Sequence, residues 1–114
     1  YGESPLPVIA EIVRQCDLNS SDVLFELGCG RGRGAFFFSH LTGCRVIGVD
    51  WVPFFIRTAE AILKDIEPSL PVSFCCNDML SVDFKQATVI YLCGTCLSDE
   101  TILSLCRRFE DASS

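Results

Sequence analysis

Short apolar runs alternate along this chain with segments whose apolar residues recur at every third or fourth position. Short apolar runs predict buried strands, whereas the wider spacing predicts amphipathic helices. We therefore expect strands at residues 23–27, 45–49, 72–76 and 87–92, and helices at residues 5–16, 35–41, 53–66 and 98–108. Strands that alternate with helices predict an α/β fold with a largely parallel sheet.

The connection after the first predicted strand carries the strongest chemical signal. The strand contains the carboxylate of Glu26 near its end and opens at once into alternating glycines, Gly28, Gly30 and Gly32. Glycine allows a sharp turn and lets a ligand approach bare backbone. The start of the next helix favours an anionic ligand group. A carboxylate beside this loop would repel a pyrophosphate but would suit a cationic amine, as in S-adenosylmethionine.

Three segments at predicted strand ends together resemble the class I S-adenosylmethionine-dependent methyltransferases. They are Glu26-Leu27-Gly28-Cys29-Gly30-Arg31-Gly32, then Gly48-Val49-Asp50, then Asn77-Asp78-Met79. Their order and spacing fit that family over most of the 114 residues. The resemblance implies an S-adenosylmethionine-dependent methyltransferase and a Rossmann-like, three-layer α/β/α fold with a mainly parallel sheet.

The family's sheet has seven strands, with the fourth in the middle, whereas only four are expected here. Residues 1–114 are therefore interpreted as one domain, the N-terminal portion of a methyltransferase fold without its later strands. The strand at 87–92 would then expose an apolar edge, and exposed edges favour pairing with another chain. Self-association through this edge is accordingly a possible property of the chain.

The resemblance also implies how these segments would contact the cofactor. Backbone of the loop at Gly28, Cys29, Gly30 and Gly32 would face the methionyl carboxylate, with Glu26 near the ammonium. The alternative for these residues is a tight turn that binds nothing.

A carboxylate at the end of the second strand, Asp50, can accept hydrogen bonds from both ribose hydroxyls. It could instead cap the next helix. Trp51 would lie against the adenine or belong to the core. In the family, an acid at Asp78 accepts from the adenine amine and an apolar residue at Met79 stacks on the ring. Asn77 precedes them, and the alternative for this group is a polar turn.

The first residues and the segment after strand four bear on the acceptor. Tyr1-Gly2-Glu3 resembles the segment that reaches over the cofactor in the non-SET nucleosomal lysine methyltransferases and their small bacterial relatives. Tyr1 and Glu3 are thus further candidate cofactor contacts, unless they form a frayed tail. Those enzymes carry asparagines after strand four, where this chain has Cys93-Gly94-Thr95-Cys96. Lysine methylation is therefore not supported, and the acceptor, a protein or a small molecule, is not identified.

The chain contains eight cysteines and one histidine, His40. Most of the cysteines lie within or beside apolar runs, which favours reduced, packed thiols and an intracellular, cytoplasmic protein. Cys93 and Cys96 have the spacing of a redox pair, although packed or site-lining thiols are the alternative. No second pair of this spacing exists, so no zinc site is expected. No side chain stands out as catalytic.

Composition narrows the class of partner. A net charge of -6 argues against a broad nucleic-acid-binding surface on this piece. No apolar stretch reaches the length of a membrane span.

Two other functions stay open. One is an NAD(P)-binding oxidoreductase, because Gly30-x-Gly32-x-x-Ala35 followed by Asp50 fits the relaxed dinucleotide pattern. The other is a non-catalytic cofactor-binding remnant or interaction module.

Overall fold

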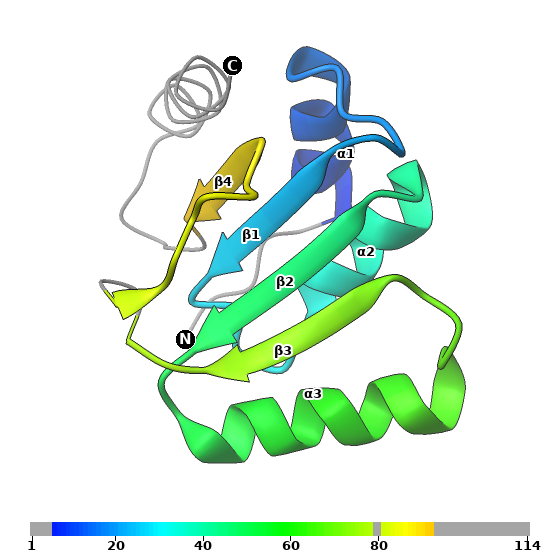
Figure 1. Ribbon diagram of the computed structural model, residues 1–114. Coiled ribbons are helices and arrows are strands. Elements are labelled where there is room, and N and C mark those ends of the chain that lie inside the picture. The colour runs from blue at the N-terminus through cyan, green and yellow to red at the C-terminus, as the bar shows by residue number, and fades with distance from the viewer. Residues whose placement is uncertain (1–5, 79–80, 93–114) are drawn as a thin grey trace.

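The computed structural model describes residues 6–78 and 81–92 of the chain (Figure 1). They form α1 (Leu6–Gln15), β1 (Val23–Leu27), α2 (Arg33–Thr42), β2 (Arg45–Asp50), α3 (Pro53–Ile66), β3 (Val72–Cys76) and β4 (Val89–Leu92). The predicted alternation of strands and helices is confirmed for these residues. The helix expected at residues 98–108 lies outside them.

Three of the predicted elements, β1, α3 and β3, have the bounds that the sequence pattern indicated. The others differ at their ends. Helix α2 begins two residues earlier than expected, since its first turn includes the polar Arg33 that an apolar pattern leaves out. Strand β4 begins two residues later, because the N–H of Ala87 donates to the carbonyl of Phe84 and so closes a turn before the strand.

The four strands form one parallel sheet in the order β3-β2-β1-β4. Because all strands point the same way, their carboxyl ends meet at one edge of the sheet. The register also aligns residues from all four strands in one row. Gly48 lies between Glu26 and Phe74, and Glu26 has Tyr91 on its other side. This row is close to the glycine loop.

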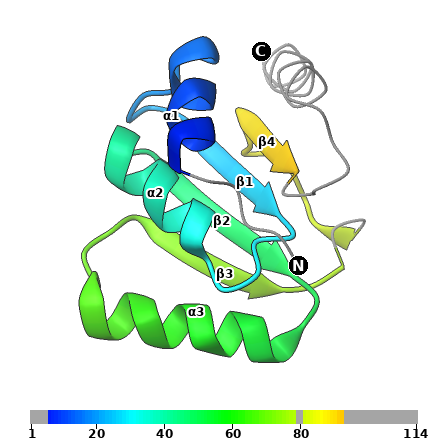
Figure 2. The same ribbon diagram turned by 180° about the vertical axis from the view of Figure 1, so that it is seen from behind.

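The described helices gather on one side of the sheet. Figure 1 shows α1 and α2 behind the strands, and Figure 2 shows them in front, with α3 running along β3. The larger core cluster fills the space between helices and sheet, where the ring of Phe38 meets that of Tyr91 edge-on at 5.1 Å. Its buried members are Ile9, Ile12, Leu18, Leu24, Ala35, Phe38, Cys44, Val46, Val72, Val89 and Tyr91.

A second, smaller core cluster lies on the other face of the sheet. Its strand members alternate with those of the first cluster, as the two-residue period of a strand requires. Phe25 packs edge-on against Phe84 at 5.5 Å, so the connection before β4 covers this face. The Rossmann-like class is therefore confirmed, with one helical layer and the sheet present in the described part.

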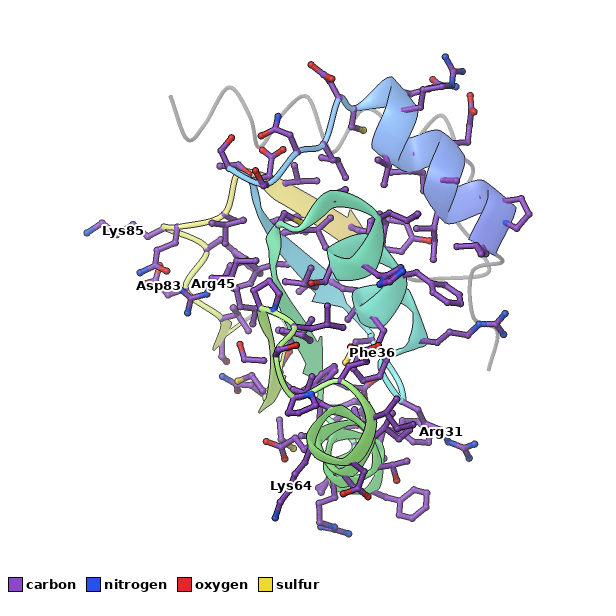
Figure 3. All side chains as sticks on the ribbon, turned by 90° about the vertical axis from the view of Figure 1, so that its right-hand side faces the viewer. Arg31, Phe36, Arg45, Lys64, Asp83 and Lys85 are labelled. Atoms are coloured by element: carbon purple, nitrogen blue, oxygen red, sulfur yellow. The ribbon has the colours of Figure 1, made fainter. Side chains whose placement is uncertain are left out.

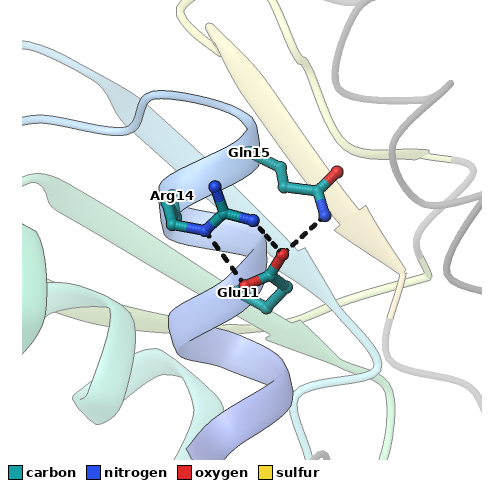
Figure 4. Close-up of polar contacts among 3 residues, drawn as sticks. All are labelled: Glu11, Arg14 and Gln15. Atoms are coloured by element: carbon teal, nitrogen blue, oxygen red, sulfur yellow. Dashed lines mark hydrogen bonds and ion pairs between the residues drawn. The ribbon is translucent and has the colours of Figure 1, made fainter.

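On the exposed side of α1, Glu11 accepts hydrogen bonds from Arg14 and Gln15 (Figure 4). Nε of Arg14 lies 3.1 Å from Oε2 of Glu11, and Nε2 of Gln15 lies 2.6 Å from Oε1. These bonds, chiefly the one from Arg14, lower the pKa of Glu11 from 4.5 to about 2. The contribution of these bonds to the stability of the folded chain is thus present above pH 4.5 and is lost as the pH falls toward 2, where Glu11 becomes protonated.

Five of the eight cysteines lie in the described part, and all five are reduced thiols: Cys16, Cys29, Cys44, Cys75 and Cys76. Burial raises the pKa of the Cys44 thiol, which keeps it protonated in the core. Among the helices that the structure describes, none is long and apolar enough to cross a bilayer.

We predict that Phe38→Ala lowers the free energy of unfolding by about 3–5 kcal/mol, because it removes a fully buried ring and leaves a cavity. Leu41→Ala on the same helix is the matched control. Leu41 is 47% exposed, so its loss should change stability by no more than about 0.5 kcal/mol. Urea unfolding of both variants measures the difference. Similar losses of unfolding free energy in the two variants would contradict the placement of Phe38 in the main core.

Candidate functional site

The glycine loop begins directly after β1 and ends at α2. Gly28, Gly30 and Gly32 have φ angles of 74°, 57° and 91°, a left-handed conformation that side chains disfavour. The N–H groups of Gly28 and Cys29 donate to the carbonyl of Val49 at 2.8 and 3.0 Å, and that of Gly32 donates to the carbonyl of Cys29 at 3.0 Å. The loop is therefore a tight turn fastened to the end of β2.

Asp50 fixes the loop from the side of β2. Only 5% of the residue is exposed, and its Oδ2 accepts a hydrogen bond from the N–H of Gly30 at 2.9 Å. Oδ1 accepts from the N–H of Val52 at 3.0 Å. The cap residue of α3 is Val52, without a side-chain cap bond, so the interpretation of Asp50 as the helix cap is wrong.

The end of β3 joins the same group of backbone contacts. The N–H of Asn77 donates to the backbone carbonyl of Asp50 at 3.0 Å. The structure thus brings together the glycine loop, Asp50 and Asn77, three segments that are far apart in the sequence. They meet at the carboxyl edge of the sheet, where α/β folds bind their ligands.

Glu26 is buried beneath the first turn of α2. Only 1% of the residue is exposed. A Cβ atom placed on Gly34 would lie 2.0 Å from Oε2 of Glu26, so the carboxylate occupies the space that a side chain would fill. The positive end of the helix dipole favours a carboxylate at this place. Gly34 was not selected from the sequence, although it is the fourth glycine of the alternating run.

An aromatic ring supports the loop from below. A Cβ atom on Gly32 or on Gly48 would lie 2.7 Å from the ring of Phe74, which itself meets Phe36 edge-on at 5.6 Å. Cys29 is also buried, and its Sγ would lie 3.1 Å from a Cβ atom on Gly48. Phe74 is a supporting residue that the sequence analysis missed, because only the sheet register places it under the loop.

Other candidate residues lie on the surface of this edge. Trp51 is 77% exposed, so the interpretation of this ring as ordinary core is wrong. Asn77 and Asp78 are exposed, with the N–H of Asp78 donating to Oδ1 of Asn77 at 2.8 Å. Their side chains are therefore accessible at the carboxyl edge of the sheet. Tyr1, Glu3, Met79, Cys93 and Cys96 lie outside the described residues.

The two arginines of the loop region are exposed and lie over aromatic rings. The guanidinium carbon of Arg31 is 5.9 Å from the centroid of Phe55, and that of Arg33 is 5.3 Å from the centroid of Phe37. Figure 3 shows Arg31 extending outward beside α3. Neither arginine was expected to bind the cofactor. Within residues 6–78 and 81–92, no group of three or more His, Cys, Asp or Glu side chains could hold a metal ion.

We predict that Gly34→Ala destabilises the chain by about 1–3 kcal/mol, because the new methyl group collides with the Glu26 carboxylate. In a Glu26→Ala background that collision is gone. There the same substitution should be neutral or stabilise by up to about 1 kcal/mol, since alanine favours a helix over glycine. A double-mutant cycle by urea unfolding measures this coupling. Equal effects of Gly34→Ala in both backgrounds would contradict the contact.

Comparison with known proteins agrees with this geometry. A family model described as a methyltransferase domain matches residues 24–111. The sterol 24-C-methyltransferase of Eremothecium gossypii is 27% identical over 77 residues, which cover 68% of this chain and 21% of that protein. The H3 lysine-79-specific histone-lysine N-methyltransferase of Dictyostelium discoideum is 25% identical over 126 residues, covering 99% of this chain and 7% of that protein. This chain therefore spans only a small part of these curated relatives.

Solved structures share the fold. The crystal structure of an RNA methyltransferase from Salinibacter ruber in complex with S-adenosyl-L-homocysteine is similar with a TM-score of 0.74 and 28% identity. The match covers 80% of this chain and 60% of that one. Because the family model covers most of the sequence, including the glycine loop, Asp50 and the end of β3, the chain belongs to the methyltransferase domain family.

Proposed function

We propose that this chain is the cofactor-binding part of an S-adenosylmethionine-dependent methyltransferase. The observation that carries the proposal is the arrangement at the carboxyl edge of the sheet. A glycine loop is held by Asp50, and the carboxylate of Glu26 lies under the helix that the loop begins. An acidic site of this kind favours a cationic ligand over a pyrophosphate. Family membership and the S-adenosyl-L-homocysteine complex of the Salinibacter ruber relative support the same cofactor.

The described contacts refine the role of the loop. The N–H groups of Gly28, Cys29, Gly30 and Gly32 already donate within the chain. The glycines therefore act by allowing a ligand to approach the backbone closely. The donors for the methionyl carboxylate would come from the backbone of the first turn of α2, since the N–H groups of a first turn point out of the helix at its N-terminal end. The carboxylate of Glu26, beneath the first turn of α2, would attract the ammonium group electrostatically.

The ribose and adenine would lie along the ends of β2 and β3. The N–H groups of Gly30 and Val52 hold the carboxylate of Asp50 at the end of β2, where the ribose hydroxyls would donate to the same carboxylate. The exposed ring of Trp51 is available to lie against the adenine. Asn77, Asp78 and Met79 would border its other side, and Tyr1 and Glu3 would cover the cofactor.

Methyl transfer from this cofactor needs few catalytic side chains from the protein. S-adenosylmethionine, when bound, supplies a methyl group that the sulfonium already activates. The chain's contribution is to hold this donor in line with an acceptor and to exclude water, an effect that can lower a barrier by about 7–11 kcal/mol. This accounts for a site whose recognisable residues all serve binding. No catalytic base is assigned.

The acceptor is left unassigned. The names of the matched proteins indicate a sterol, a histone lysine and an RNA as acceptors of those proteins, so the shared domain does not fix one. The reduced thiols of the described part are compatible with the cytoplasmic location expected from the sequence. Self-association through the edge of β4 stays a prediction.

The proposal is tested by calorimetric titration with S-adenosylmethionine, S-adenosyl-L-homocysteine and NAD. We expect micromolar binding of the first two and none of NAD. Asp50→Ala and Glu26→Gln should each weaken binding about 10–100-fold, which corresponds to the loss of a charge-assisted contact of about 1.5–3 kcal/mol. Glu60→Ala, which removes an exposed carboxylate on α3, should leave affinity unchanged.

The controls separate binding from folding. Circular dichroism of each variant at the titration temperature shows whether it is folded. Binding of NAD alone would revive the oxidoreductase interpretation. Absence of binding to all three ligands by the folded chain would favour the remnant or interaction module instead.

A further inference from the structure

The ring of Phe74 reaches from β3 across β2 to the glycine loop. Its Cδ1 atom would lie 2.7 Å from a Cβ atom on Gly48 of β2, and its Cζ atom would lie 2.7 Å from a Cβ atom on Gly32. Because Cζ is the far end of the ring, the ring passes over Gly48 and ends at Gly32. Gly32 in turn is the N-cap residue of α2. A side chain of β3 therefore touches the start of α2.

Packing from several elements holds this ring in place. Phe36, in the first turn of α2, meets the ring edge-on, with the two centroids 5.6 Å apart. On the helical side of the sheet, Phe74 packs against the larger core cluster. Helix α3 closes the same space, because a Cβ atom on Gly32 would lie 3.2 Å from the Cβ atom of the buried Ala59. The ring is thus fixed between β2, α2 and the loop.

The two ends of the proposed cofactor site lie on the two elements that this ring connects. Under the proposed function, the first turn of α2 holds the methionyl carboxylate and the end of β3 borders the adenine. Phe74 stands three residues before Asn77, on the strand that ends at the adenine. Its far end touches Gly32, where the helix at the methionyl end begins. The ring therefore lies between the supports of the two ends and holds them at one separation.

Glycine makes the position of the loop depend on this ring. Neither Gly32 nor Gly48 has a side chain, so neither residue fills the space that is left when the end of the ring is removed. The loop then gains room to move toward the sheet. A ligand that is held at both ends loses affinity when the separation of its supports changes, because it no longer reaches both in their best positions. A ligand that is held at one end only is insensitive to that separation.

We propose that Phe74 is a positioning residue that sets the span of the cofactor site, and that it thereby determines affinity for the complete cofactor but not for its nucleoside part. This role rests on the proposed function, because it presumes a cofactor that is held at both ends. Phe74 acts through the backbone of Gly32 rather than by touching the cofactor, since its ring lies beneath the loop.

The test compares two ligands that differ only at the methionyl end. S-adenosyl-L-homocysteine reaches both ends of the site, whereas methylthioadenosine has the nucleoside and the sulfur but neither the carboxylate nor the ammonium. Phe74→Leu keeps the atoms over Gly48 and removes those at Gly32. It should weaken binding of S-adenosyl-L-homocysteine about tenfold and binding of methylthioadenosine by less than about twofold. Titration calorimetry measures the first affinity, and ligand-observed NMR measures the weaker second one.

Two further variants separate the reach of the side chain from a general loss of packing. Phe74→Met has as many side-chain heavy atoms as Phe74→Leu but is unbranched and longer, so it should restore most of the affinity for S-adenosyl-L-homocysteine. Phe25→Leu makes the same change to a ring on the other face of the sheet, which packs on Phe84 away from the loop. It should leave both affinities unchanged. Circular dichroism of each variant shows whether it is folded, and Phe74 is only partly buried, so its variants should be.

Failure of this role and failure of the proposed function give different results. An equal loss of both ligands in Phe74→Leu, no loss in that variant, or a Phe74→Met variant that binds as weakly would each overturn the positioning role. The same selective loss in Phe25→Leu would overturn it too, because the effect would then come from a loosened core. In all these cases, binding of S-adenosyl-L-homocysteine by the unaltered chain would still support the proposed function. An unaltered chain that does not bind this ligand would overturn both.

Discussion

Close packing across one row of the parallel sheet is the constraint on which the rest of this structure depends. The row holds Phe74, Gly48, Glu26 and Tyr91 on four neighbouring strands. It contains a large ring and a carboxylate on either side of a residue without a side chain. Phe74 fits only because Gly48 and Gly32 have no Cβ, and Glu26 fits only because Gly34 has none. The glycines thus set the distance between the loop, α2 and the sheet.

This packing explains how an apolar sheet carries a polar site at one edge. Glu26 and Asp50 are both almost fully buried, yet both lie against backbone at the start of a helix or in the loop. Asp50 accepts two backbone hydrogen bonds, which offset the cost of burying its charge. The carboxylates therefore have fixed positions before any ligand arrives. A preorganised acidic site of this kind suits a cofactor that carries an ammonium and a sulfonium.

Helix α3 connects this edge with the outside of the molecule. Its inner side packs on β2 and β3, so its position follows from the same sheet that positions Asp50. Its outer side presents apolar and charged residues to solvent. Only Val52 separates its first turn from the exposed Trp51 at the same edge.

The local features of this protein could be predicted from its residues alone. Apolar spacing predicted β1, α3 and β3 at their observed bounds, because the periods of strand and helix are properties of the chain. The residue types themselves identified Glu26, the glycine loop and Asp50, since turn-forming glycines and carboxylates at strand ends can be recognised without a structure. Only the folded arrangement shows that Phe74 supports the loop, that Gly34 makes room for Glu26 and that Trp51 is exposed. Each of these depends on strand register and helix placement, which bring together residues whose separation in the sequence gives no sign of contact.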